Sequence, residues 1–237
     1  MKKRKVLIFT GNRAEYGLQL PVVKSLNRSK KINCSLMVSG SHLDKKFGET
    51  ISQIKKDKLR IVDKIKLKNI YNSNLQIPYL IGQAVIKISR SIYKQKPDIF
   101  LVNADRFETF AATIASTQLN IPTFHIEGGD KTEGGALDDS VRHAITKLSD
   151  YHFVSTGGAK QRVIRLGENP KYVFNTGCPS LDLARNIGDL NFDPYLKYGG
   201  VGKYPKYKKG YLVVMQHPVT NEYKESRSQI SHTLKAI

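Results

Sequence analysis

The stretch Pro97-Asp98-Ile99-Phe100-Leu101-Val102-Asn103-Ala104-Asp105-Arg106 joins a short apolar run to an acidic, polar end. The run at 98–102 has the length of a buried strand, and the proline in front of it marks where the strand begins. Apolar residues at helical spacing then follow over 105–119. A buried strand that leads directly into an amphipathic helix is the repeating unit of a parallel sheet.

The same alternation extends along the chain on both sides of this unit. Parallel strands with intervening helices form a sheet that is covered on both faces, with right-handed crossovers. We therefore expect an α/β fold built on a Rossmann-like parallel sheet with helices on both faces. Further strands are predicted at 6–10, 34–38, 61–67, 122–126, 151–155 and 171–175, and further helices at 15–26, 42–56, 77–93, 139–148 and 156–166.

A segment rich in glycine, proline, lysine and tyrosine interrupts the alternation at 186–209, which is typical of a linker or a long loop. An apolar run at 211–215 then predicts another buried strand, and a polar helix follows it to residue 237. One strand and one helix cannot bury a core of their own. We therefore expect an N-terminal domain at 1–185, a linker at 186–209 and the start of an incomplete second domain at 210–237, in a chain that is a fragment or the product of a truncated reading frame.

The chain is strongly basic, with 39 Lys and Arg against 20 Asp and Glu and a formal net charge of +19. The lysines are spread over predicted helices and strand ends, as at 55–58, and no basic ribbon interleaved with aromatic residues is present. Net charge of this kind governs solubility and non-specific binding rather than fold. We therefore interpret it as a solvated surface and expect no nucleic-acid partner.

Other features of the sequence indicate the cellular compartment and whether a metal site is present. No apolar run approaches the roughly 18 residues that span a bilayer, and the run at 6–10 is too short for a secretory signal. We therefore expect a cytoplasmic protein without a membrane partner. Cys34 and Cys178 give neither a disulfide framework nor a zinc spacing, so both are interpreted as buried or neutral thiols, and no metal site is predicted.

Acidic residues gather in one short region of this basic chain, because eight of the 20 lie at 101–150. Asp105 follows the central predicted strand, Glu127 follows the next one, and Asp138 precedes the helix after that. The carboxyl ends of parallel strands meet at one edge of a sheet, where ligands bind. We therefore expect these acids to converge on one site suited to acid–base chemistry.

Two of the three acids also have a purely structural explanation. Asp105 with Glu108 three residues later matches a helix capping box, and either Asp138 or Asp139 can cap the helix that follows. Glu127 is different, because a pair of glycines follows it and it begins no helix. Repulsion from neighbouring acids would raise its pKa and suit it to proton transfer.

Two arginines are candidates for binding an anion. Arg13 stands at a predicted helix start behind a glycine turn, where backbone N–H groups attract anions. The loop has neither the ending of a P-loop nor the glycine spacing of a dinucleotide site, so no nicotinamide cofactor is expected. Arg142 lies in the first turns of the helix at 139–148, where it would steer a phosphate or a carboxylate or form a surface salt bridge.

The histidines divide into two groups. His42 and His217 come directly after predicted strands, at the edge of the sheet where ligands bind, and a functional role is favoured for both. His125 and His152 lie in or next to strands and are interpreted as structural.

Seven motifs occur in order along the chain: Gly11-Asn12-Arg13-Ala14-Glu15-Tyr16, Gly40-Ser41-His42-Leu43, Asp105-Arg106-Phe107-Glu108, His125-Ile126-Glu127-Gly128-Gly129, the helix start at 138–148, Gly177-Cys178-Pro179-Ser180 and Gln216-His217-Pro218-Val219-Thr220. Together they resemble the hydrolysing UDP-N-acetylglucosamine 2-epimerases of sialic-acid-type biosynthesis. The resemblance covers nearly the whole chain, and the set is specific although each motif alone is weak. Members of that family continue far beyond His217, so the resemblance implies a chain that is truncated in its C-terminal domain.

The resemblance implies a two-domain fold like that of GT-B glycosyltransferases, with the nucleotide sugar in the cleft between the domains. It implies conversion of UDP-N-acetylglucosamine (UDP-GlcNAc) to N-acetylmannosamine (ManNAc) and UDP, without a metal or redox cofactor. The proton at C2 is removed as UDP leaves, and water then adds at C1 of a glycal-type intermediate while C2 is protonated from the opposite face. This chemistry needs at least two proton-transfer groups and stabilisation of the departing diphosphate.

The resemblance also assigns roles to individual residues. The catalytic acids that it implies are Asp105, Glu127 and Asp138, and which of them takes the C2 proton stays open. The substrate-binding residues that it implies are Arg13 and His217, followed by His42, Arg106 and Arg142.

Three other interpretations stay open. The first is a related hydrolysing epimerase that acts on another nucleotide sugar, such as a UDP- or GDP-diacetamido-trideoxyhexose. The second is a GT-B glycosyltransferase, although its acceptor site would not need three acids at successive strand ends. The third is an inactive fragment or a binding domain, favoured by the truncation and by the charge of +19. A homo-oligomer, either a dimer or a tetramer, is also expected.

Overall fold

A computed structural model describes residues 2–132, 137–185, 187, 192–199, 201–204, 212–217 and 220–237 of the chain. The chain divides into two compact units, Met1–Gly188 and Asp189–Ile237. The predicted boundaries of an N-terminal domain, a linker and a second domain stay a prediction.

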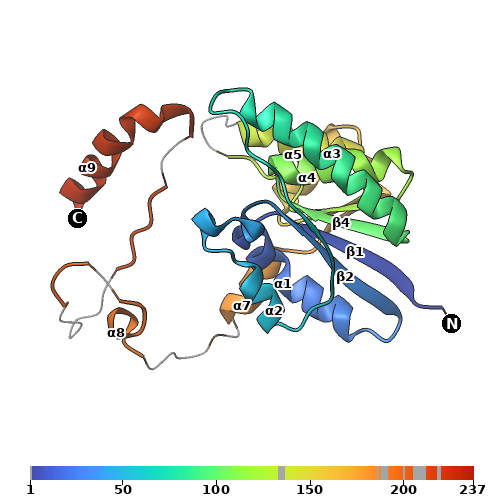
Figure 1. The fold of residues 1–237 in the computed structure, drawn as a ribbon, viewed down its shortest axis with the longest axis horizontal. Coiled ribbons are helices and arrows are strands. Elements are labelled where there is room, and N and C mark those ends of the chain that lie inside the picture. Colours follow the sequence, from blue (N-terminus) through green and yellow to red (C-terminus); the bar gives the residue numbers. More distant parts are fainter. Residues whose placement is uncertain are drawn as a thin grey trace. The chain divides into compact units, whose positions relative to one another are not determined.

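A parallel sheet forms the centre of the first unit (Figure 1). Its strand order is β3-β2-β1-β4-β5-β6-β7, and every neighbouring pair of strands is parallel. The predicted Rossmann-like sheet is therefore confirmed, and each strand overlaps a predicted one. The strands are β1 (Arg4–Thr10), β2 (Ile32–Ser39), β3 (Ile61–Ile65), β4 (Ile99–Asn103), β5 (Thr123–Ile126), β6 (Tyr151–Val154) and β7 (Val173–Asn175).

Helices cover both faces of this sheet, as the sequence predicts (Figure 1). On one face α3 packs against α4 and α4 against α5, whereas α1 and α7 pack against each other on the opposite face. A further helix, α6, contacts β6 and β7. The helices of this unit are α1 (Arg13–Arg28), α2 (Ile51–Lys56), α3 (Gln76–Gln95), α4 (Phe107–Gln118), α5 (Leu137–Leu148), α6 (Gly157–Arg165) and α7 (Pro179–Arg185).

The side chains of β1 alternate between two hydrophobic cores. Leu7 and Phe9 belong to the core that includes α3 and α4, whereas Val6 and Ile8 belong to the core that includes α1 and α2. All four are almost completely buried. Because full burial of a large apolar side chain is worth roughly 1.5–3 kcal/mol, this central strand is a firm base for the loops at its carboxyl end.

The predicted helix at 42–56 is wrong in its first half. Two short 3-10 helices, Gly40–Leu43 and Lys45–Phe47, take its place, and α2 begins only at Ile51. Gly48 and Glu49 have φ angles of 78° and 48°, in the left-handed region where a right-handed helix ends. Helical spacing of apolar residues alone does not reveal such a turn.

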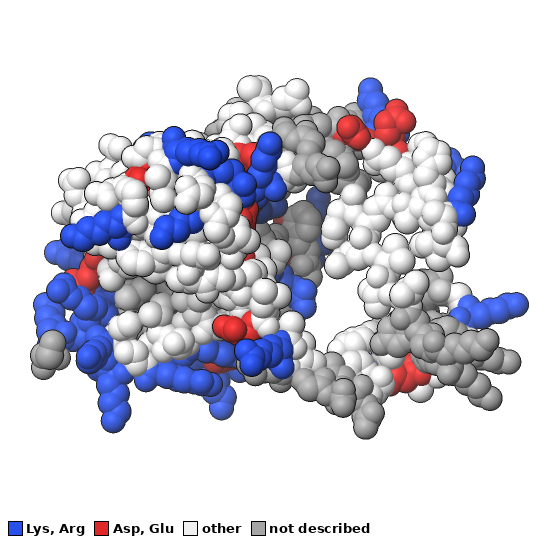
Figure 2. All heavy atoms as spheres, turned by 180° about the vertical axis from the view of Figure 1, so that it is seen from behind, with Lys and Arg blue, Asp and Glu red and all other residues white. Residues whose placement is uncertain are grey.

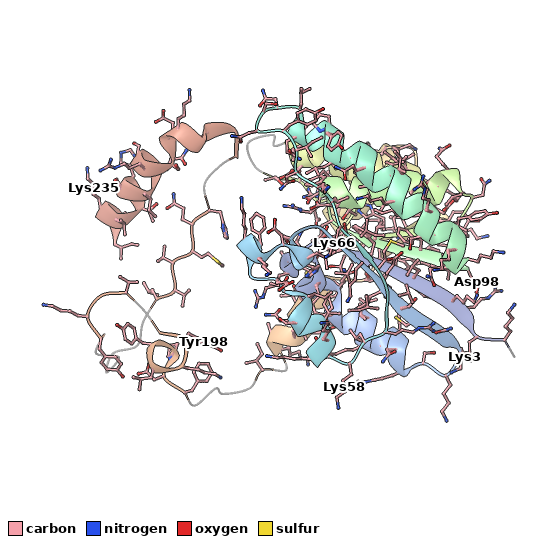
Figure 3. The ribbon with its side chains drawn as sticks, viewed as in Figure 1. Lys3, Lys58, Lys66, Asp98, Tyr198 and Lys235 are labelled. Carbon is pink, nitrogen blue, oxygen red and sulfur yellow. The ribbon has the colours of Figure 1, made fainter. Side chains whose placement is uncertain are left out.

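Lys and Arg side chains are spread widely over the visible surface of the first unit (Figure 2). Lys58 and Lys66, which follow α2 and β3, are exposed examples (Figure 3). The expected absence of a nucleic-acid partner stays a prediction. None of the described helices combines the length and the apolar character that crossing a bilayer requires.

The second unit contains α8 (Pro194–Tyr198), a 3-10 helix at Thr220–Glu225 and α9 (Ser226–Ala236). The strand predicted at 211–215 is wrong over 212–215, which form no regular structure and are exposed, and Tyr211 lies outside the described residues. A strand needs hydrogen-bonded neighbours to satisfy its backbone and bury its side chains. The described part of this unit contains no such neighbour.

Candidate functional site

The candidate site lies where the strand order reverses, between β1 and β4. A crevice forms at such a point beyond the carboxyl ends of the strands, because the connections leave in opposite directions. Here a cavity of about 250 Å³ opens between the loop after β1, the loop after β4, the end of β5 and α5. The predicted site residues Asp105, Arg106, Glu127 and Arg142 all line it.

Asp105 and Arg142 form an ion pair in this cavity. Their side chains are only 19% and 10% exposed, so the pair is largely shielded from water. Burial raises the pKa of the Asp105 carboxyl, and the charge and hydrogen bond of Arg142 partly oppose this shift. The capping explanation of Asp105 is wrong, because α4 has Arg106 at its N-cap and no capping side-chain hydrogen bond.

Arg142 also binds α5 to the loop in front of it. Its Nη1 donates to Asp139 Oδ1 at 2.8 Å and to the Asp130 carbonyl oxygen at 2.7 Å. Asp139 in turn accepts the Thr132 N–H at 2.9 and 3.0 Å. Burial opposes ionisation of Asp139, but these hydrogen bonds and the charge of Arg142 prevail and lower its pKa. The surface salt bridge proposed as the alternative for Arg142 is wrong, because its ion pairs with Asp105 and Asp139 are largely buried, and its substrate-binding role stays a prediction.

Asp138 is exposed in the first turn of α5, beside the cavity rather than in its wall. Its charge contributes to raising the pKa of Asp105, so the two carboxylates lie within electrostatic range. Neither Asp138 nor Asp139 is the cap, because α5 begins at Leu137 and the residue in front of it lies outside the described residues.

Glu127 occupies an unusual backbone position at the end of β5. Its φ of 62° is left-handed, and Ala104, at the matching end of β4, has a φ of 60°. The Glu127 N–H donates to the Phe153 carbonyl oxygen at 2.9 Å, and its carboxyl Oε1 accepts the Cys178 thiol at 3.1 Å. Burial raises the pKa of this carboxyl. Left-handed residues other than glycine cost about 1–3 kcal/mol and cluster at functional sites.

Two further buried acids that the sequence did not single out are Glu15, which lines the cavity, and Glu108, which binds Arg106 of the cavity wall. Glu15 is 3% exposed, accepts the Gly11 N–H at 2.7 Å and the Thr109 hydroxyl at 2.6 Å, and burial raises its pKa to about 7. Glu108 is 2% exposed and accepts two hydrogen bonds from Arg106, at 3.2 and 3.3 Å. Both acids occur in the quoted motifs, but their spacing suggested only a helix start and a cap.

Arg13 lies in an adjoining hollow of about 620 Å³, lined also by Tyr16 and Asp57. Its Nε donates to Gln53 Oε1 at 3.2 Å, and the guanidinium group is exposed. Ala14 and Leu18 line both this hollow and the cavity that contains Asp105, so the two spaces are neighbours. The binding role of Arg13 stays a prediction.

The histidines differ in how far they are buried, and this decides which of them a substrate can reach. His42 is completely buried, with Nε2 3.0 Å from Thr10 Oγ1 and Nδ1 2.8 Å from Thr50 Oγ1, and burial lowers its pKa to about 4. Its ring therefore presents no surface to a substrate, which corrects the direct binding role. His125 is buried as interpreted, and it holds the Ala104 carbonyl oxygen at 2.9 Å. His217 is exposed in the second unit, and its role stays a prediction.

No group of three His, Cys, Asp or Glu side chains that could hold a metal ion occurs among the described residues. The chemistry that the cavity itself offers is proton transfer by two carboxyl groups from adjacent strands, beside two arginines that can bind an anion.

Comparison with known proteins links this geometry to one family. The family model described as UDP-N-acetylglucosamine 2-epimerase matches residues 24–237. A UDP-N,N'-diacetylbacillosamine 2-epimerase (hydrolyzing) of Legionella pneumophila is 37% identical over 98% of this chain and 60% of its own length. A GDP/UDP-N,N'-diacetylbacillosamine 2-epimerase (hydrolyzing) of Campylobacter jejuni is 30% identical over 100% of this chain and 60% of its own length.

Solved structures share the fold. The UDP-GlcNAc 2-epimerase of Neisseria meningitidis, bound to UDP-GlcNAc, has a TM-score of 0.65 at 24% identity and covers 75% of this chain and 48% of its own. The corresponding enzyme of Methanocaldococcus jannaschii has a TM-score of 0.62 at 20% identity, covering 77% and 50%. The chain thus spans about 60% of the curated relatives it matches and about half of these structures.

Proposed function

The chain belongs to the UDP-N-acetylglucosamine 2-epimerase family, and from this premise we propose that it carries the acid–base half of a hydrolysing 2-epimerase for a UDP-linked 2-acetamido sugar. The observation that carries the proposal is the convergence of Asp105, Glu127 and Arg142 on one cavity at the strand-order reversal. Two carboxyl groups enter this cavity from adjacent strands, and the reaction needs two proton-transfer groups on opposite faces of C2.

The proposed reaction is an elimination followed by hydration. A carboxylate of the site takes the proton from C2, the C1–O bond breaks, and UDP leaves with the bonding electrons. A carboxylic acid of the site then gives a proton to the opposite face of C2 of the glycal, water adds its hydroxyl group to C1, and the remaining proton of the water passes to the carboxylate that this acid has become. The products are UDP and the free sugar with inverted C2, so the net change is hydrolysis with epimerisation.

The environments of the acids support these two proton-transfer roles. Burial raises the pKa of both Asp105 and Glu127, which brings each carboxyl closer to the pH at which it can both give and take a proton. Arg142 keeps Asp105 oriented, and Arg106 lies in the same wall, where a developing negative charge on the departing diphosphate would be stabilised. Asp138 is the third proposed acid, at the edge of this cavity.

For the sugar, we propose UDP-N,N'-diacetylbacillosamine first and UDP-GlcNAc second. The support is that the Legionella and Campylobacter relatives, at 37% and 30% identity, are named for diacetylbacillosamine. The Neisseria relative named for UDP-GlcNAc is 27% identical over 92% of this chain. The order in which we propose the two substrates therefore follows the sequence identity of the relatives that are named for them.

The test is turnover in D₂O. Because the chain spans about 60% of its relatives, the test uses the protein as its gene encodes it. We expect release of UDP and a 2-epimeric free sugar that carries deuterium at C2, both detected by NMR. Release of UDP only when a sugar acceptor is added, without deuterium at C2, would identify a glycosyltransferase instead. If neither UDP-sugar is converted, the epimerase proposal is wrong for both substrates.

A further inference from the structure

We propose that Cys178 is a positioning residue for Glu127, which it orients in the cavity through a thiol hydrogen bond. The inference rests on the proposed function, and it gives a role to a cysteine that the sequence suggested to be only a buried or neutral thiol. The Cys178 thiol is 3.1 Å from Glu127 Oε1, although the two residues are 51 positions apart. With Oε1 occupied by the thiol, Oε2 is the oxygen left to exchange a proton with a substrate.

Cys178 is itself fixed in place. It lies between β7 and α7, where the Thr176 N–H donates to the Val154 carbonyl oxygen at 3.0 Å and the Leu181 N–H donates to the Cys178 carbonyl oxygen at 3.2 Å. Gly177 has a φ of 77°, a left-handed turn that suits glycine and aims the next side chain toward β5. Ser180 Oγ is 3.0 Å from the Cys178 sulfur, so the thiol lies in a short chain of hydrogen bonds that ends on Glu127.

A second, independent observation marks the same carboxyl. Asn103 on β4 is 1% exposed and pairs in register with Ile126, the residue before Glu127. Among the described residues, neither its Oδ1 nor its Nδ2 has a hydrogen-bond partner of normal geometry. The Asn103 side chain still acts on Glu127 as a hydrogen-bonding neighbour that lowers its pKa, so a second group beside the thiol favours the ionised carboxylate.

The expected effect on Glu127 follows from the charges that surround it. A thiol that donates to a carboxylate favours its ionised form, whereas burial favours the neutral form. Asp130, in the loop after β5, raises the pKa of Glu127, and Arg142 on α5 lowers it. Asp105, from the loop after β4, lines the same cavity. Loss of the thiol removes one of the stabilising contacts of the carboxylate and leaves the others unchanged.

The test measures Glu127 directly in the full-length protein. The side-chain carboxyl is titrated by carbon-13 NMR with labelled glutamate, and its signal is assigned by its loss in Glu127→Gln. We expect Cys178→Ala to raise the pKa of Glu127 by about one unit, the size of one hydrogen bond to a charged group. Cys178→Ser keeps a donor at that position and should return most of the shift. Cys34→Ala, in the buried β2 far from Glu127 in the sheet order, is the matched control and should leave it unchanged.

A kinetic measurement separates positioning from a merely structural role. In Cys178→Ala we expect kcat to fall about tenfold with KM within about twofold, and the limb of the pH–rate profile that reports Glu127 to move upward with the titration. An unchanged Glu127 titration in Cys178→Ala overturns the inference, as does an equal loss of kcat in the Ala and Ser variants without movement of the limb. The titration requires no turnover, so a wild-type protein without C2 exchange would refute the proposed function while still testing this contact.

Discussion

Asp105 and Arg142 form a largely buried ion pair that ties the loop after β4 to α5, across a separation of 37 residues in sequence. The same guanidinium group also holds Asp139 and the Asp130 carbonyl oxygen, so one side chain fixes three parts of the cavity wall.

Replacing Arg142 by glutamine should therefore destabilise the first unit. Asp105 and Asp139 would lose their buried cationic partner, and breaking such a pair typically costs about 3–5 kcal/mol. Urea denaturation of the full-length protein, followed by circular dichroism, measures the loss. Arg13→Gln is the matched control, because Arg13 is exposed and has one side-chain hydrogen bond, so it should change stability by no more than about 0.5 kcal/mol. Equal stabilities of the two variants would contradict this.

Glu15 should make stability fall as pH rises. Its pKa in the folded protein, about 7, is higher than the ordinary value of 4.5, so between these values the folded state holds a proton that the unfolded state has lost. Stability is then greatest below about pH 4.5 and declines up to about pH 7, by on the order of 3 kcal/mol from this group.

Glu15→Gln removes that titration. The difference in free energy of unfolding between wild type and Glu15→Gln should change by a few kcal/mol between pH 5 and pH 8, in favour of the variant at the higher pH. Glu49→Gln, at an exposed position, should show no such change. If the free energy of unfolding changed with pH in the same way in the wild type and in Glu15→Gln, Glu15 would have an ordinary pKa in the folded protein.

Gly40 should tolerate no side chain. It has a φ of 54°, and a Cβ atom there would lie 2.5 Å from the Gly11 carbonyl oxygen and 2.6 Å from Glu108 Oε1. Gly40→Ala should lower the melting temperature and cost at least about 2 kcal/mol, since the left-handed conformation alone costs about 1–2. Gly82→Ala, inside α3 with open space around it, should instead stabilise by about 0.5–1 kcal/mol. A stable Gly40→Ala variant would show that the loop after β2 can move away.

Glu127→Gln should abolish turnover without unfolding the protein. The amide keeps the size and one acceptor oxygen but cannot transfer a proton, and the loss should reach about 10²–10⁴ in kcat. Steady-state UDP release and C2 deuteration measure it, with circular dichroism to confirm folding. Activity within about tenfold of wild type would remove Glu127 from the list of proton-transfer groups.

His42→Leu should act on stability rather than on substrate affinity. It leaves the Thr10 and Thr50 hydroxyls without their ring partner, at a cost of about 1–3 kcal/mol. KM of the folded variant should stay within about twofold. A tenfold rise in KM at unchanged stability would restore the substrate-binding role predicted from sequence.

The sheet was predictable because its signal is local: each buried strand is a short apolar run bounded by polar residues, as at 98–102. The edge that carries the site followed from the same pattern, since Asp105 and Glu127 end neighbouring strands. The sequence could not show which side chains contact each other when they lie far apart along the chain. The pairing of Asp105 with Arg142, or of Glu127 with Cys178, depends on loop geometry that no local spacing encodes.

The same limit explains the wrong expectations. His42 looks functional because it follows a strand, but the left-handed turn at Gly48 brings Thr50 back onto its ring. The run at 212–215 looks like a buried strand, but no described neighbour pairs with it. Glu15 and Glu108 looked like helix-start residues, and only the contact between the starts of α1 and α4 shows that they are buried together.

The long separations within the site also determine when it can form during synthesis. The cavity begins with Asn12, yet the thiol that holds Glu127 is at Cys178, and β1 acquires its second neighbour only when β4 arrives. At about 5–20 residues per second, the ribosome needs roughly 8–30 s to pass from one end of the site to the other. Until α4 has been made, the apolar side chains of β1 lack part of their native cover, so early nascent chains should be clients of ribosome-associated chaperones. The completed site should be among the last features of the first unit to appear.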